Sequence, residues 1–351
     1  MSLVTASAAT LATALAALKP GDTLRLQGAF ETLGRPKAAR LQGVTIDAAG
    51  ATIGGLFYPA GAVTGLTLKG GTWAGVRLDK AERISVEGAT FQGPAEAADG
   101  GGLSVVDGRG ITVNGAVFDS FKTGIGLGRV TGFEIRDCGF SRMRSDGITI
   151  GESRQGTVMD NIFHGTRITS SEHPDAVQLF SRPTSAPTAD IVITRNLVVG
   201  MTQGLTGFNH VRDGVDDGGF DRIVIAENRL YVGYPNAIAL VDARRSVIRG
   251  NEVSTYPGAT YRASINATRC TELTRSGNIV RAGAGKAPVV DPDWVDGLAE
   301  ARASIASLQD MNQRLAQQRD QYKAGADALA ACLAQIAELA VRPGAARPSP
   351  V

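Results

Sequence analysis

Apolar and polar residues alternate in short segments that recur from Leu66 to Val280. In the copy Ile111-Thr-Val-Asn-Gly-Ala-Val-Phe118, the alternating residues lead to a polar or glycine corner, and an apolar residue follows five positions after the last inward side chain. Alternation of period two predicts a strand. The copies end at Trp73, Phe91, Phe118, Phe140, Phe163, Val198, Leu230, Val253 and Val280, so they recur after 18 to 35 residues. This interval predicts one supersecondary unit per copy, as in the stacked coils of a parallel β-helix.

A second set of strands is predicted between these copies, so that each coil carries at least two strands on different walls. The segments are Val76–Leu78, Leu103–Val105, Ile125–Leu127, Ile148–Ile150, Val177–Leu179, Ile238–Leu240 and a weaker one near Ile265. With a spacing of roughly 4.8 Å between coils, about ten coils would form a rod roughly 48 Å long. Only the last copy breaks the pattern, because Arg275 stands at an inward position.

The corner of each later copy is an asparagine. These residues are Asn161, Asn196, Asn228, Asn251 and Asn278. An asparagine at a corner can adopt a left-handed backbone conformation, and its side-chain amide can bond to the equivalent residue one coil away. We therefore expect a ladder of amides along the stack.

The two ends of the chain differ from the repeats. Residues 1–22 are predicted to cap the stack with a short amphipathic helix over Ala6–Leu18, and the β-helix is expected over 23–293. From Leu298 to Ala340 apolar residues follow heptads, which predicts a coiled-coil helix within 294–341 that joins identical chains, most simply three. The alternative is one amphipathic helix packed back on the β-helix. Residues 342–351 are expected to be a flexible tail.

Charge and cysteine content exclude several classes. The 351 residues carry 36 basic and 34 acidic side chains, a formal charge of +2, which argues against a nucleic-acid binder. The cysteines Cys138, Cys270 and Cys332 lie too far apart for local disulfides or thiolate metal sites. No basic residue precedes Lys19 and no apolar run reaches about 20 residues, so we expect neither a signal peptide nor membrane insertion.

Chemistry is expected where the repeat spacing widens. The extra residues must leave the coil as loops, and the candidates are 164–173, 181–189 and 208–220. All three histidines of the chain, His164, His173 and His210, fall in these loops.

The segment His173-Pro-Asp-Ala-Val-Gln178, with Ser145-Asp-Gly-Ile148 one coil earlier, resembles a motif pair of right-handed β-helix proteins in the pectate-lyase-like superfamily, especially phage tail spikes. The N-terminal helix and its Pro-Gly-Asp turn resemble the cap of the same proteins. The resemblance implies a right-handed β-helix and a surface for carbohydrate, but it supplies no reaction. The aspartate patterns of polygalacturonase-like hydrolases and the Tyr-Gly-Phe-Asp-Pro-His run of mannuronan epimerases are missing from the sequence.

Asp146, His173 and Asp175 are the candidate catalytic residues. Asp146 and Asp175 occupy equivalent positions on successive coils, where two carboxylates interact and the pKa of one rises, as acid–base catalysis requires. Alternatively, they belong to a polar column with Thr123 and Asn236 that only caps corners. His173, beside Glu172, is a candidate base for removing a proton from a uronic acid, with Arg182 or Arg212 neutralising the sugar carboxylate. The alternative is a plain surface histidine.

The candidate substrate-binding residues are Glu172, Gln178, Arg182, His210, Arg212 and Tyr234. Small neutral residues share the outward face of the second strand set with Gln178, which suits a shallow platform for a sugar chain. Sugar rings rest on exposed aromatic residues such as Tyr234, although tyrosines near these coils can equally pack at corners. Asp213, Asp216 and Asp217 lie on a glycine-rich loop that suits a calcium ion, but the same residues are common in turns. No other cofactor is expected.

Taken together, these patterns predict a virion-tail protein that recognises a bacterial surface polysaccharide, and whether it also cleaves the polysaccharide stays open. Its partners would be identical chains and other tail proteins. Two alternatives remain open: a soluble bacterial polysaccharide lyase or uronate epimerase, and a structural spike or fibre segment without a ligand. The choice between a lyase and a glycoside hydrolase also stays open.

Overall fold

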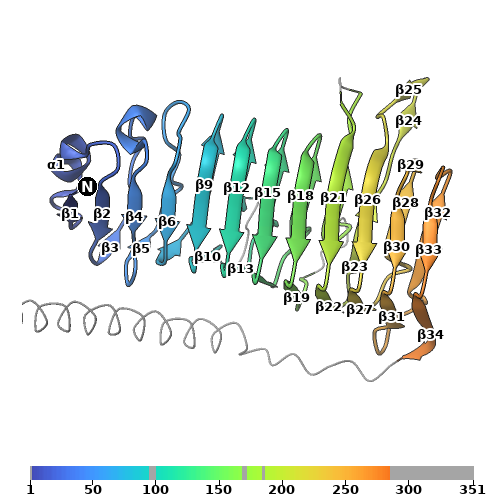
Figure 1. Ribbon diagram of the computed structural model, residues 1–351. Helices are drawn as coiled ribbons and strands as arrows, with labels where there is room; N and C mark the ends of the chain where they lie inside the picture. Colours follow the sequence, from blue (N-terminus) through green and yellow to red (C-terminus); the bar gives the residue numbers. More distant parts are fainter. Residues whose placement is uncertain (1, 95–99, 168–171, 184–185, 285–351) are drawn as a thin grey trace, which may run out of the picture. The chain divides into compact units, whose positions relative to one another are not determined.

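A computed structural model describes residues 2–94, 100–167, 172–183 and 186–284. These residues form an all-β solenoid in which three parallel sheets make three walls (Figure 1). The repeat predicts the parallel stack and at least two of these walls. The predicted coiled coil over 294–341 and the tail 342–351 lie outside the described residues.

The first wall is a 13-stranded sheet. Its strands are β1 (Leu3–Ala6), β2 (Thr23–Leu26), β4 (Thr45–Asp47), β6 (Thr67–Lys69), β9 (Glu82–Glu87), β12 (Arg109–Asn114), β15 (Thr131–Arg136), β18 (Arg154–Met159), β21 (Thr188–Thr194), β26 (Phe220–Ala226), β30 (Val247–Arg249) and β33 (Thr274–Ser276), with β29 (Ala243–Arg244) beside β26.

The second wall is an 11-stranded sheet that receives the apolar residue at the end of each sequence copy. Its strands are β3 (Ala29–Phe30), β5 (Thr52–Ile53), β7 (Thr72–Trp73), β10 (Thr90–Gln92), β13 (Val117–Asp119), β16 (Gly139–Ser141), β19 (Ile162–His164), β22 (Leu197–Gly200), β27 (Arg229–Val232), β31 (Glu252–Thr255) and β34 (Ile279–Ala284).

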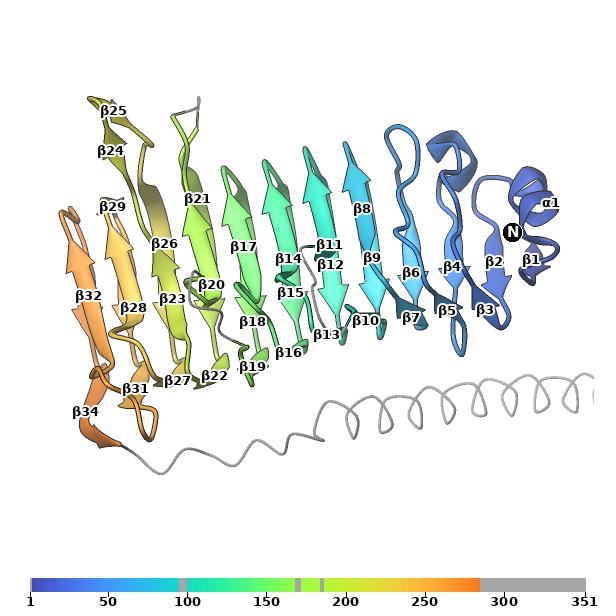
Figure 2. The same cartoon turned by 180° about the vertical axis from the view of Figure 1, so that it is seen from behind.

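The third wall is an eight-stranded sheet that contains the second set of predicted strands (Figure 2). Its strands are β8 (Val76–Asp79), β11 (Gly101–Val106), β14 (Thr123–Gly128), β17 (Ile148–Gly151), β20 (Asp175–Phe180), β23 (Gln203–Gly207), β28 (Asn236–Val241) and β32 (Ser264–Thr268). The sequence pattern missed β23, because Gln-Gly-Leu-Thr-Gly has one large apolar residue, Leu205, and so shows no alternation.

The core of the solenoid is a stack of like residues from successive coils. The rings of Phe91, Phe118, Phe140 and Phe163 lie one above the other with centroid separations of 4.6, 5.0 and 4.6 Å and nearly parallel planes. The spacing of these rings follows from the distance between hydrogen-bonded strands, which is about 4.8 Å. Arg275 pairs with the buried Ile248, as its inward position predicts, and donates a hydrogen bond of 3.2 Å to the carbonyl of Ile265.

The asparagine ladder is present. Nδ2 of Asn161 donates to Oδ1 of Asn196 at 3.0 Å, and the next three steps, ending at Asn278, are 2.9 Å each. The expectation of a left-handed backbone conformation at the asparagines is wrong. The residue before each asparagine has this conformation instead. Asp160, Arg195 and Glu227 have φ of 56°, 54° and 58°. The preceding residue turns the chain and the asparagine remains inside the corner, where its amide replaces water as the partner of buried backbone groups.

The N-terminal end differs from the prediction in its first residues. The helix α1 covers only Leu11–Ala17, and a strand, β1, precedes it and pairs in parallel with β2. The strand pairs the edge of β2 that would otherwise be open. A 3-10 helix spans Ala38–Leu41. Over the described part of the chain, no helix has the length and apolar character that crossing a membrane requires.

Candidate carbohydrate site on the third wall

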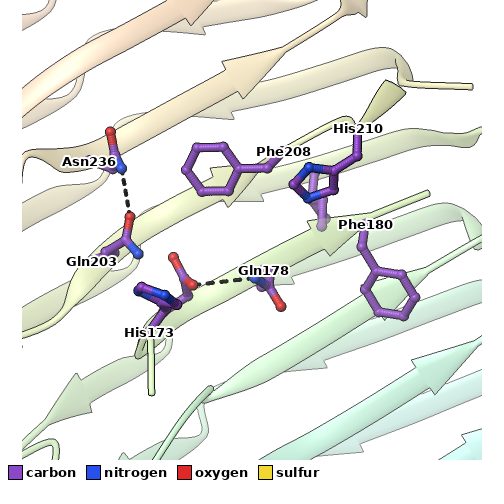
Figure 3. Close-up of a pocket in the computed structure, with 9 residues that line it drawn as sticks. His173, Gln178, Phe180, Gln203, Phe208, His210 and Asn236 are labelled. Carbon is purple, nitrogen blue, oxygen red and sulfur yellow. Dashed lines mark hydrogen bonds between the residues drawn. The ribbon is translucent and has the colours of Figure 1, made fainter. Parts of the chain in front are cut away.

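A pocket of about 470 Å³ lies on the third wall where β20, β23 and β28 are neighbours (Figure 3). These strands and the loops beside them supply its side chains. The residues that line it are His173, Asp175, Gln178, Leu179, Phe180, Gln203, Phe208, His210 and Asn236.

The loops predicted from the widened spacing build part of this pocket. His173 precedes β20, while Phe208 and His210 follow β23 on the connection to the antiparallel hairpin β24 (Val211–Arg212) and β25 (Val215–Asp216). His164 is not a lining residue, because it belongs to β19 on the second wall. Burial lowers the pKa of His164, and the nearby Arg142 lowers it further.

Asp175 and Asp146 are held in contact by the stacking of β17 and β20. Ile148 pairs with Val177, which places the two aspartates at equivalent positions, as predicted. The backbone N–H of Asp175 donates to Oδ1 of Asp146 at 3.1 Å. Their side chains are nearly inaccessible, since Asp146 is 7% and Asp175 1% exposed.

Burial shifts the ionisation of both carboxyls in the same direction. It raises the pKa of Asp146 from 3.8 to about 6, with a smaller contribution from the negative charge of Glu172. It also raises the pKa of Asp175 well above its ordinary value, and the charge of Asp146 adds to this shift. The hydroxyl of Thr206 donates to Oδ1 of Asp175 at 2.8 Å, and Gln178 approaches the other oxygen at 3.5 Å. Asp175 therefore lines the pocket as a carboxyl of raised pKa, and Asp146 lies beside it at the equivalent position one coil earlier.

Glu172 takes part in an ionic contact inside the protein. Its Oε1 lies 3.6 Å from Nζ of Lys122 and 3.5 Å from a guanidinium nitrogen of Arg144. It does not line the pocket described here. Glu172 is the residue before His173, so its carboxylate, with its two cationic partners, lies at the edge of the site.

Besides Glu172, three more of the predicted substrate-binding residues do not line this pocket. Nε of Arg182 lies 3.9 Å from Oε1 of Glu152, and the guanidinium carbon of Arg182 lies 5.5 Å from the centre of the Phe180 ring. Arg212 is exposed on the hairpin, where it pairs with Val215. Tyr234 is half-buried in the turn before β28. The sequence placed them near the right coils, but whether a loop residue turns into a pocket depends on the path of the loop.

The proposed calcium ligands are not gathered. Asp216 pairs with Val211 in the hairpin, and its Oδ1 accepts hydrogen bonds from Asn209 and from the amide of Gly218 at 2.9 and 2.7 Å. In the described ranges, no group of three His, Cys, Asp or Glu side chains is arranged to hold a metal ion. Asp213, Asp216 and Asp217 therefore correspond to the alternative interpretation, a polar turn.

Sequence reasoning missed Phe180, Gln203 and Phe208. Gln203 pairs with Asp175 and stands between it and Asn236, whose Nδ2 donates to Oε1 of Gln203 at 2.7 Å. Asp146, Asp175 and Asn236 belong to the polar column that the sequence predicts. Alignment of the weak repeat that contains Leu205 adds Gln203 to this column. The two phenylalanines lie at the end of a strand and in a loop, where alternation carries no information.

The solenoid is matched by a known family model. Residues 57–210 match the family described as "Right handed beta helix region". This match indicates a right-handed β-helix over residues 57–210. No curated protein matches the chain in a sequence search.

Among solved structures, the tailspike of E. coli bacteriophage HK620 has the same fold. A pentasaccharide complex of a tailspike mutant is 12% identical, with a TM-score of 0.51, over 76% of this chain and 56% of the tailspike chain. A hexasaccharide complex of another tailspike mutant is 11% identical, with a TM-score of 0.52, over 77% of this chain and 55% of the tailspike chain. This β-helix chain thus spans just over half the length of the tailspike. An alginate lyase from Paenibacillus sp. str. FPU-7 is 15% identical, with a TM-score of 0.43, over 80% of this chain and 99% of the lyase.

Proposed function

We propose that this β-helix protein binds a bacterial surface polysaccharide and that the third-wall pocket holds one of its sugar units. The observation that carries the proposal is the composition of the pocket, in which the rings of Phe180 and Phe208 occur together with the amides of Gln203 and Asn236 (Figure 3). Aromatic rings pack on the C–H face of a sugar, and amides exchange hydrogen bonds with its hydroxyls. The volume, about 470 Å³, lies within the roughly 300–1,000 Å³ typical of ligand pockets.

A role in a phage tail is the biological setting that we propose for this binding. Its support is the predicted heptad helix in the sequence, together with the fold shared with the HK620 tailspike, which was solved with oligosaccharides bound. Three chains joined through 294–341, in contact with other tail proteins, would each present a pocket. Repetition of the pocket makes a weak single contact sufficient.

Cleavage of a glycosidic bond by hydrolysis is a second function favoured by Asp175. A carboxyl that keeps its proton near neutral pH can donate it to the leaving oxygen of a glycosidic bond. Its place in the lining of the pocket and the upward direction of its pKa shift, which burial causes, support this role. The lyase alternative relies on Arg182 or Arg212 to neutralise a sugar carboxylate, and neither lines the pocket.

The test of binding is a screen of the full chain on an array of bacterial oligosaccharides, followed by calorimetry on the strongest hit. Replacing Phe208 by Ala should weaken binding at least tenfold and leave the circular dichroism spectrum unchanged. Tyr261→Ala is the matched control, since Tyr261 is 58% exposed and does not line the pocket. A failure to bind any glycan contradicts the proposal and favours the structural alternative.

The reaction and the assembly need separate measurements. Mass spectrometry should show hydrolysed products with the parent chain and none with Asp175→Asn, whereas a rise in ultraviolet absorbance would reveal the unsaturated sugar that a lyase produces.

Light scattering of the full chain should give a trimer, and a chain that ends at Asp293 should give a monomer. Monomers from both chains would reject the proposed assembly.

A further inference from the structure

The ionisable groups of the pocket include no permanent cation. Among the described residues that line it, only Asp175 and the histidines His173 and His210 can ionise. The rest are amide, aromatic or aliphatic side chains. The two short segments outside the description within 164–190 have the sequences Ile-Thr-Ser-Ser and Thr-Ser, so neither adds an ionisable side chain.

Several cations around the pocket already contact carboxylates of the same chain. Lys122 and Arg144 contact Glu172, and Arg182 contacts Glu152. Beyond β28, Arg269 forms two hydrogen bonds with Asp242, at 2.7 and 2.8 Å. A ligand carboxylate would compete with these internal partners for a counter-ion, and Arg212, which is exposed on the hairpin, does not line the pocket.

Asp175 offers no positive charge to an anion in either of its ionisation states. When ionised, its carboxylate repels a second carboxylate, and when protonated it is a neutral donor. Transfer of an unpaired carboxylate from water into such a partly enclosed site carries a desolvation cost that no cation of the lining offsets. The lining therefore discriminates against acidic sugars.

The amide side chains suit hydroxyl groups instead. Gln203 and Asn236 are bonded to each other at 2.7 Å, and Asn266 continues the row on the next coil by donating to Asn236 at 2.9 Å. An amide presents a donor and an acceptor side by side, which matches neighbouring hydroxyls of a sugar. The row leads from the pocket towards the exposed Asn266, so it offers similar groups to the next sugar unit of a polymer.

We infer that this pocket selects an uncharged sugar unit and rejects the carboxylate of a uronic acid. The inference rests on the proposed function, since it specifies the substrate class of the same site. It separates this protein from a lyase or epimerase, because both act at the acidic carbon beside a uronate carboxylate.

The test uses matched pairs of glycans that differ only in charge. Uronate-containing bacterial oligosaccharides are compared at neutral pH with the same oligosaccharides after chemical reduction of the carboxyl group to an alcohol, on an array that also holds neutral oligosaccharides. All strong hits should be uncharged, and each reduced form that binds should bind at least tenfold more tightly than its uronate parent. If uronates are preferred, the inference is overturned and the binding function stands. If nothing binds, both are overturned.

A charge-introducing variant gives an independent reading. Gln178→Lys places a cation on the half-buried, outward face of β20 within the pocket, and should shift the ratio of uronate to neutral affinity by at least tenfold. Thr149→Lys is the matched control, because Thr149 is the register partner of Gln178 one coil earlier and does not line the pocket. An equal shift in both variants would show a general charge effect and contradict the inference.

Discussion

The backbone amide of Asp175 donates a hydrogen bond of 3.1 Å to the side chain of Asp146, one coil earlier. This contact links the pocket to the coil before it, because Asp175 lines the cavity and Asp146 is buried at the equivalent position one coil earlier. The stacking of coils thus brings two acidic groups together in a site that water reaches poorly. Burial then raises the pKa of both carboxyls.

Replacing Asp146 by Asn should make the protein more stable near neutral pH. The pKa of Asp146 is about 6 in the folded state against 3.8 ordinarily, so the folded protein binds this proton more tightly than the unfolded chain. The stability from this proton is complete below pH 3.8 and is lost as the pH rises through about 6. The gain at neutral pH should be about 2–3 kcal/mol at most.

Urea denaturation of both proteins between pH 4 and 8 measures this effect. The parent should lose stability relative to the variant over pH 4–6, and Glu272→Gln, at an exposed position, should follow the parent. Parallel curves for parent and Asp146→Asn would show that burial of Asp146 does not govern this part of the pH profile.

Removal of the Thr206 hydroxyl should raise the pKa of Asp175 further. Thr206→Val keeps the shape of the side chain but deletes the donor that bonds to Oδ1 at 2.8 Å and favours the ionised carboxyl. Carboxyl ¹³C resonances followed through a pH titration report the change directly. Thr149→Val, on the same face two coils away, is the control. An unchanged or lower pKa of Asp175 is the contrary result.

Loss of one ladder asparagine should destabilise the whole solenoid. The amide nitrogen of Asn196 donates to Val158 and Asn228, and its Oδ1 accepts both the backbone and side-chain nitrogens of Asn161. Asn196→Ala leaves these buried groups without partners, which should lower the free energy of unfolding by about 3–5 kcal/mol. Guanidinium denaturation compares it with Asn266→Ala at an exposed position, where a loss below about 1 kcal/mol is expected. Equal losses of unfolding free energy in the two variants would show that the ladder position contributes no more than an exposed one.

Gly147 should tolerate no side chain, because β17 and β20 approach closely there. Its amide donates to the carbonyl of Asp175 at 2.9 Å, and a Cβ would lie 2.6 Å from both the carbonyl of Ala176 and the ring of Phe163. Gly147→Ala should cost about 1–3 kcal/mol of stability in thermal or chemical unfolding. The matched change Gly128→Ala meets no atom within 4 Å and should be close to neutral. A neutral Gly147→Ala would show that the two coils can separate locally.

Much of the scaffold could be predicted, because each coil repeats short-range rules. Alternation around Ile111 and Val113 sets which side chains face inward, and the corner residue sets where the chain turns. The equivalence of Asp146 and Asp175 follows from the same counting. Strand β23, around Leu205, was not predicted, because one apolar residue does not define an alternation.

The composition of the pocket was only partly within reach of such rules. His173, Asp175, Gln178 and His210 were candidates, and all of them line it. Phe180 joins them from the end of β20, and Phe208 joins them from the loop that follows β23. Arg182 and Arg212 were expected there and lie elsewhere, with Arg182 in contact with Glu152.

The order of residues along this chain thus establishes the coil, its inward faces, its amide ladder and the close approach of two aspartates. These features repeat at a regular interval, and backbone hydrogen bonds between successive coils impose the register. Three-dimensional folding decides which loop side chains enter the pocket, which cations are already paired, and hence which charge the pocket accepts. Those outcomes depend on contacts between segments that share no period, and burial alters the ionisation of Asp175 only after the contacts have formed.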